Sequence, residues 1–166
     1  MHVRGAYTRD MARDRWEWLE GLRSTSIEEA LAHEAARVLA DELLAWPPPI
    51  AWDDPRAEAE FAPLFQPDAR RPPLAAIGLG FRFARWELER QFEAIDHAAR
   101  NHLLERELTD EQDRLAARFL WRWLPEWLLE LKERAGPRIT RAHLIVALEQ
   151  AEARVRGHVA GPSLAH

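Results

Sequence analysis

The chain has 166 residues, of which 47% are hydrophobic and 31% charged, and its formal net charge at pH 7 is −5. A chain of this length can form one domain that buries roughly 70% of the surface its unfolded form exposes, so we expect a folded globular protein. The absence of cysteine excludes disulfide scaffolds, thiolate zinc sites and cysteine nucleophiles.

The sequence also argues against export and against insertion into a membrane. Its first ten residues, MHVRGAYTRD, lack the apolar stretch of a secretory signal, and no run of about 18 apolar residues occurs that could span a bilayer. We therefore expect a cytoplasmic protein that binds no membrane. The basic residues are almost all arginine, with Lys132 as the single lysine, which indicates the coding bias of a GC-rich bacterial genome.

Helical patterns come first along the chain. One helix is predicted near residues 9–20, and a second is predicted to begin at Ser26, whose spacing to Glu29 fits a capping box, and to run to about Trp46. We expect these two helices to form a hairpin over residues 9–46.

A proline-rich connection follows. Eight of the eleven prolines fall between Pro47 and Pro73, so a continuous helix cannot form there. Asp54 followed by Pro55 is typical of a helix start and predicts a short helix to about Phe61. The rest of this stretch should be irregular.

The second half of the chain is predicted to contain longer helices. One helix is expected over residues 74–107, and at 1.5 Å per residue it would be roughly 40 to 50 Å long. Thr109 and Gln112 fit a second capping box, and Thr140 is expected to cap a last helix that stops at Gly157.

These elements predict an all-α fold. No stretch shows the two-residue alternation of a half-buried strand. We expect a single-domain helical bundle of five to seven helices over residues 1–166, with C-terminal helices at 110–156. The proline-rich irregular segment around residues 47–73 should wrap its outside.

The segment FLWRWLPEWLLEL, residues 119–131, concentrates three tryptophans and five leucines. Charged residues at intervals of four, from Arg118 to Arg134, mark the side that faces water. Opposite this stripe lies an arc of normal core-facing width, formed by Leu120, Trp121, Leu124, Trp127, Leu128 and Leu131. Phe119, Trp123 and Leu129 lie beside the stripe instead, where a helix with one core face would not place them.

Pro125 leaves two alternatives for these three residues. An internal proline removes a hydrogen bond and clashes with the preceding turn, at a cost of about 3 kcal/mol. If Pro125 breaks the helix, Phe119 and Trp123 can turn toward a second side of the core. If it only kinks the helix, they remain exposed.

The favoured function is a non-catalytic one. Protein interfaces are enriched in aromatic residues and arginine, so exposed tryptophans predict a helical accessory subunit that docks onto a protein partner, or a self-associating protein. The predicted interface consists of Phe119, Trp123, Leu129, Trp121, Trp127, Trp16 and Trp18. This hypothesis loses its main support if Trp123 and its neighbours are buried within one chain.

A metal-dependent enzyme is one alternative. Glutamate and histidine occur four residues apart at Glu29/His33 and at Glu93/His97, which makes these four residues weak candidates for metal ligands. Carboxylate-bridged helical bundles instead use Glu-x-x-His, and both histidines project away from the main apolar faces. No metal, cofactor or catalytic residue is therefore assigned.

A small nucleic-acid-associated subunit is the other alternative. Residues 81–86, FRFARW, interleave arginine with aromatic side chains, a pattern that can combine base stacking with phosphate contacts. The acidic balance of the chain argues against it, because nucleic-acid-binding domains usually present a dominant basic face. The competing interpretation places Phe81 in the core and pairs Arg85 with Glu89.

Overall fold

The structure, a computed structural model, describes residues 28–46, 55–89 and 96–164, with side chains placed as far as His158. These residues form six α-helices and one 3-10 turn: α3 (Glu28–Leu44), α4 (Pro55–Glu60), η1 (Ala62–Phe65), α5 (Leu74–Glu89), α6 (His97–Glu107), α7 (Glu111–Ala135) and α8 (Arg141–Leu164). No strand occurs within these ranges, so the predicted all-α bundle is confirmed.

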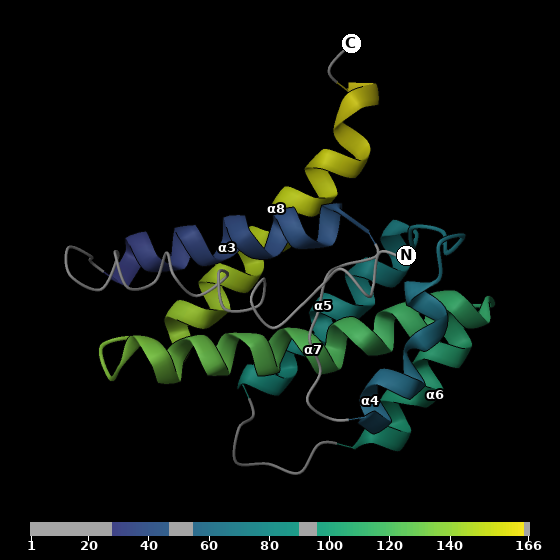
Figure 1. Cartoon of the computed structure of the whole chain (residues 1–166), viewed down its shortest axis with the longest axis horizontal. Helices are drawn as coiled ribbons and strands as arrows, with labels where there is room; N and C mark the ends of the chain where they lie inside the picture. Colours follow the sequence, from purple (N-terminus) through teal and green to yellow (C-terminus); the bar gives the residue numbers. More distant parts are fainter. Residues whose placement is uncertain (1–27, 47–54, 90–95, 165–166) are drawn as a thin grey trace.

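Helix α7 is the longest element and extends across the molecule (Figure 1). Helix α5 packs along it, α3 packs against α8, and α8 also contacts α5. Helices α4 and α6 lie toward the N-terminal half of α7 (Figure 1). None of the described helices has the length and apolar character that a membrane-spanning segment requires.

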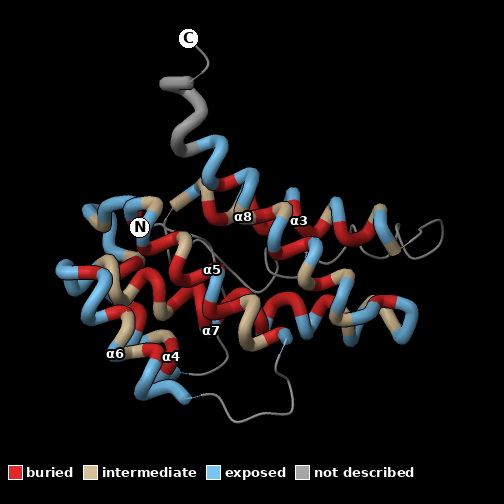
Figure 2. The backbone as a smooth tube through the Cα atoms, turned by 180° about the vertical axis from the view of Figure 1, so that it is seen from behind, coloured by how far each residue is buried: buried red, intermediate tan, exposed pale blue. Residues whose placement is uncertain are grey.

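The core has two parts that share α7. The larger cluster lies between α3, α5, α7 and α8, and the smaller one lies between α5, α6 and α7. Figure 2 shows buried backbone along α7 and along the facing sides of its neighbours. All six residues of the predicted core arc of α7 are buried, so that prediction is correct.

The close approach of α5 and α7 depends on Gly80. A Cβ atom at Gly80 would lie 2.6 Å from the Cβ of Leu120 and 3.1 Å from the backbone oxygen of Ala117. Both distances are shorter than ordinary van der Waals contact, so a side chain there would push the two helices apart. The absence of a side chain lets the backbones pack more closely.

The ends of α7 follow from capping. Asp110, and not Thr109 as predicted, is the N-cap: its Oδ1 accepts the backbone N–H groups of Gln112 at 2.7 Å and Asp113 at 3.2 Å. The pKa of Asp110 lies below its ordinary value, chiefly because the backbone N–H of Asp113 donates to its carboxylate. Arg70 lowers this pKa further. At the other end Gly136 has a φ of 103°, which favours glycine and ends the helix.

Helix α7 does not break at Pro125. It continues from Glu111 to Ala135 with Pro125 buried inside it, so the break is excluded. The side chains on both sides of the proline are packed, and this tertiary packing offsets the cost of the missing hydrogen bond.

Two other predicted boundaries are wrong. The single helix over residues 74–107 is two helices, because Asp96 has non-helical backbone angles and caps α6 by accepting the backbone N–H of Ala99 at 3.0 Å. Helix α8 begins after Thr140, as predicted, but continues past Gly157 to Leu164. Gly157 does not adopt the positive φ by which glycine usually ends a helix.

The remaining predictions, for helices in the first half of the chain, are confirmed in part. The short helix from Pro55 is confirmed as α4, and α3 ends two residues before Trp46. The predicted helix at residues 9–20 and the capping residue Ser26 lie outside the described residues.

We expect Gly80→Ala to lower the free energy of unfolding by about 1–2 kcal/mol. Overpacking against Leu120 costs about 1–3 kcal/mol, whereas alanine improves helix propensity by up to about 1 kcal/mol. Gly157→Ala is the matched control, because nothing lies within 4 Å of its Cβ position, and it should stabilise by about 0.5–1 kcal/mol. Urea denaturation measures both. Equal stabilisation by the two substitutions would contradict the close α5–α7 packing.

Candidate functional site

The side chains predicted to form an interface lie mostly inside the protein. Phe119 has 0% of its surface exposed, and Trp121, Trp123 and Trp127 have 3%, 5% and 3%. Leu129 is the exception, at 36%. Trp16 and Trp18 lie outside the described residues. Phe119 and the three tryptophans of α7 therefore lack the exposure on which their docking role depended.

Aromatic residues from the proline-rich segment cover Phe119. Phe119 stacks on Trp123 with ring centroids 5.4 Å apart, and Phe61 and Phe65 approach Phe119 edge-on at 5.5 Å and 5.7 Å. Trp46 also contacts Phe119 edge-on, at 6.3 Å. Phe61 and Phe65 thus supply the second core side that Phe119 required, and Trp123 stacks on Phe119.

The predicted metal candidates do not converge on one site. Glu29 and His33 are exposed on α3, and His97 is exposed at the start of α6. Glu93 lies outside the described residues. Within residues 28–46, 55–89 and 96–164, no group of three or more potential ligands could hold a metal ion. His97 instead contacts the ring of Trp121 edge-on, with centroids 5.2 Å apart.

The FRFARW segment follows the competing interpretation. Phe81 and Phe83 are buried in the core of the bundle, so their faces are not free to stack on bases. The Nε of Arg85 lies 3.7 Å from Oε1 of Glu89, the predicted partner. Its Nη1 lies 3.5 Å from Oε2 of Glu149 on α8. Arg82 is exposed.

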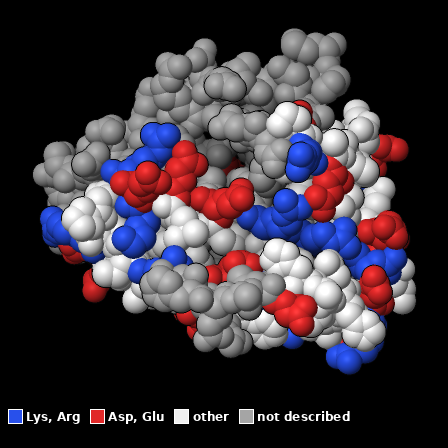
Figure 3. All heavy atoms as spheres, turned by 90° about the horizontal axis from the view of Figure 1, so that it is seen from below, with Lys and Arg blue, Asp and Glu red and all other residues white. Residues whose placement is uncertain are grey.

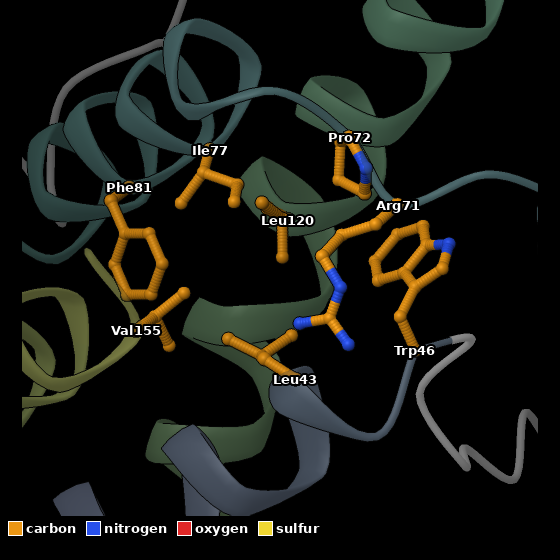
Figure 4. A pocket seen from close by; sticks show the side chains of 8 residues that line it. All are labelled: Leu43, Trp46, Arg71, Pro72, Ile77, Phe81, Leu120 and Val155. Atoms are coloured by element: carbon orange, nitrogen blue, oxygen red, sulfur yellow. The ribbon is translucent and has the colours of Figure 1, made fainter. Parts of the chain in front are cut away.

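One apolar hollow lies among α3, α5, α7 and α8. Figure 4 shows its lining side chains, which are Leu43, Trp46, Arg71, Pro72, Ile77, Phe81, Leu120 and Val155. Its free volume is about 10 Å³, at the lower limit for a single water molecule. Arg71 uses its Nη2 to donate to the backbone oxygen of Leu44 at 2.6 Å, which satisfies the end of α3. The hollow is a small packing gap and not a ligand site.

A larger, charged depression lies between α5 and α8, and we call it the α5–α8 cleft. It consists of two adjoining hollows of about 180 Å³ and 280 Å³ that share Gly78, Arg82 and Arg156. The remaining lining residues are Phe81, Arg85, Leu148, Glu149 and Glu152 in the first hollow, and Ala75, Leu79 and Glu107 in the second. The cleft therefore combines three arginines with three glutamates.

Gly78 shapes the cleft. A Cβ atom at this position would collide with the guanidinium of Arg156, so the glycine lets that side chain lie directly on the backbone of α5. The Nε of Arg156 also donates to Glu152 at 2.8 Å, one turn earlier on α8. Arg156 is thus positioned by contacts with both helices.

The charges of the cleft are only partly paired. Arg85 and Arg156 have carboxylate partners on α8, whereas no ion pair joins Arg82 to another residue in the described part of the chain. Exposed ion pairs contribute about 0–1 kcal/mol, so Arg85 and Arg156 can exchange their partners for others at little cost. Arg82 provides a guanidinium that can bind a carboxylate.

The charges on the face seen in Figure 3 are also mixed. Lys and Arg side chains lie beside Asp and Glu side chains there, so the described residues of this face carry both signs of charge.

A second polar feature, the Arg100 cluster, lies between α5, α6 and α7. Arg100 is buried, and its Nη1 donates to Oε1 of Glu87 at 3.1 Å. Its guanidinium carbon lies 5.7 Å, 5.7 Å and 5.2 Å from the ring centroids of Phe83, Trp86 and Trp121. The Nε1 of Trp121 donates to the same Glu87 oxygen at 3.2 Å. Among the described residues, three rings and one carboxylate thus surround the cation of Arg100.

Few signals in the amino-acid sequence predict either polar feature. The four-residue spacing of Glu152 and Arg156 predicts a local pair, but not the contact with Gly78. Arg100 lies in a segment predicted as the continuation of a long helix, where nothing marked it as buried. Both features depend on which helices pack together.

Comparison with known proteins yields no relative: no family model matches the chain, and no curated protein or solved structure matches it.

The Arg100 cluster predicts a non-additive stability effect. Arg100→Met should lower the free energy of unfolding by about 2–4 kcal/mol, because it leaves the half-buried carboxylate of Glu87 without its cation. Adding Glu87→Gln should recover at least about 1 kcal/mol, because glutamine still accepts from Trp121 but carries no charge. Arg106→Met, at an exposed position of α6, is the control and should change stability by less than about 0.5 kcal/mol. A double variant no more stable than Arg100→Met would contradict this description.

Proposed function

We propose that the chain is a non-catalytic helical protein that binds a protein partner through the α5–α8 cleft and not through the tryptophans of α7. The proposal is carried by one observation: a depression between two packed helices presents Arg82 without an ion-pair partner among the described residues. The burial of Trp121, Trp123 and Trp127 moves the expected surface away from α7.

Arginine suits such a role. Its planar guanidinium binds a carboxylate through two parallel hydrogen bonds, and arginine is enriched at protein interfaces. Arg82 lies on α5, which is held between α7 and α8. A site on a rigid helix loses little conformational entropy when it binds. The expected contact is an Asp or Glu side chain of the partner.

The mixed charge of the cleft favours a protein over a nucleic acid. Glu107, Glu149 and Glu152 would repel a chain of phosphates, whereas a protein segment with residues of both signs can pair with them and with the arginines. Phe81 and Phe83, which the nucleic-acid hypothesis required for stacking, are buried.

The chemistry of the cleft also favours a protein over a small molecule. Small-molecule pockets are mostly apolar. The hollows here are instead lined largely by charged side chains. Surface recognition of a partner fits this lining better.

The test compares the full chain with a charge-reversed form at natural expression level. Wild-type protein isolated from its source cells should elute in a complex of defined stoichiometry, measured by size exclusion with light scattering. Arg82→Glu should weaken the affinity for the purified partner at least about tenfold, the equivalent of about 1.4 kcal/mol. Arg37→Glu, on the exposed side of α3, is the matched control and should leave the affinity unchanged.

Two results would contradict the proposal at different levels. A monomer without companions in the native extract would contradict partner binding itself. A complex that Arg82→Glu leaves unchanged would contradict the cleft as its site. If the site is correct, reversing one acidic residue of the partner to Arg should restore binding to Arg82→Glu and weaken binding to wild type.

A further inference from the structure

The Arg100 cluster has the chemistry of a cation-binding cage. Aromatic faces attract a cation through the negative charge density above the ring, and the attraction is strongest when the cation is shielded from water. Arg100 is within 6 Å of three ring centroids and is 7% exposed. The walls of the cage belong to α5 and α7 and not to α6. They are Phe83, Trp86 and Glu87 from α5 and Trp121 from α7.

Arg100, which occupies the cage, comes from α6, a helix with few other buried side chains. Arg100 and Leu104 are the buried residues of α6. Most other positions of α6 are exposed, including His97, His102 and Glu105. Segments with few buried apolar contacts open locally at a lower free energy than the whole domain. Movement of α6 would withdraw Arg100 and leave the walls of the cage on the packed α5–α7 pair.

We infer that the Arg100 cluster is a binding site for an alkylguanidinium group, such as an arginine side chain of another protein, and that the chain's own Arg100 occupies it until α6 moves away. Glu87 determines the class of ligand. Its Oε1 accepts from both Trp121 and Arg100, so a ligand needs an N–H donor to replace the second bond. A quaternary ammonium ion has none and should bind less well.

This inference is independent of the α5–α8 cleft. Arg82 and Arg85 line that cleft, whereas Phe83, Trp86 and Glu87 form the cage from other positions on α5. Either site can fail its test without affecting the other.

The test empties the cage and supplies the missing group. Purified full-length Arg100→Ala is titrated with ethylguanidinium at constant ionic strength, while tryptophan fluorescence and the melting temperature are recorded. We expect saturable binding with a Kd on the order of millimolar, because a ligand of few atoms gains limited free energy, and an increase in melting temperature. Arg106→Ala, the matched control on α6, should show neither response.

Two further arms test the chemistry of the site. Adding Glu87→Gln to Arg100→Ala should weaken ethylguanidinium binding at least about fivefold, because the charged acceptor is lost. Tetramethylammonium should bind Arg100→Ala more weakly than ethylguanidinium does. A folded Arg100→Ala that shows no saturable binding, or that prefers tetramethylammonium, would overturn the inference.

A measurement on the wild-type protein covers the case in which Arg100→Ala does not fold. Millimolar ethylguanidinium should compete with Arg100 and accelerate hydrogen exchange of the α6 amides at least about twofold, while exchange in α7 stays unchanged. Sodium chloride at the same ionic strength should not do so. Equal exchange in the two salts would overturn the inference without the use of any variant.

Discussion

The close packing of α5 on α7 at Gly80 is the constraint on which the rest of the structure depends. Because Gly80 has no side chain, the backbone of α5 lies directly against Leu120 and the carbonyl of Ala117. This contact leaves α7 with a large core on the side of α3 and α8 and a smaller one on the side of α6. It also holds α5 so that Arg82 lines the α5–α8 cleft while Phe83 faces α6.

Helical periodicity explains why much of the fold could be predicted. The six core residues of α7 follow the 3.6-residue repeat, and its end at Gly136 follows from the backbone freedom of glycine. Phe119 and Trp123, which stack on each other, could not be placed in this way. The rings that pack against Phe119, those of Phe61 and Phe65, belong to a short segment without a repeat. The effect of Pro125 on its helix was also ambiguous in the sequence. Local chemistry favours a break at this proline, and only the tertiary packing around it keeps the helix continuous.

The polar sites were harder to predict than the core. Arg82 and Arg156 are far apart in the sequence, and their meeting depends on how α5 packs on α8 and on the absence of a side chain at Gly78. Arg100 lies on α6, whose separate start after Asp96 the apolar pattern of residues 74–107 concealed. A pattern of hydrophobic residues identifies the buried face of a helix, but not the neighbour that this face meets.

Native-state hydrogen exchange across a denaturant series tests most directly whether the α5–α7 contact organises the fold. If it does, the amides of Ala76–Ala84 in α5 and of Ala116–Leu128 in α7 should exchange only through global unfolding and share the highest protection free energy. The amides of α6 should exchange through a smaller opening. If the amides of α5 exchanged at a lower protection free energy than those of α3 and α8, the α5–α7 contact could not be the one that organises the fold.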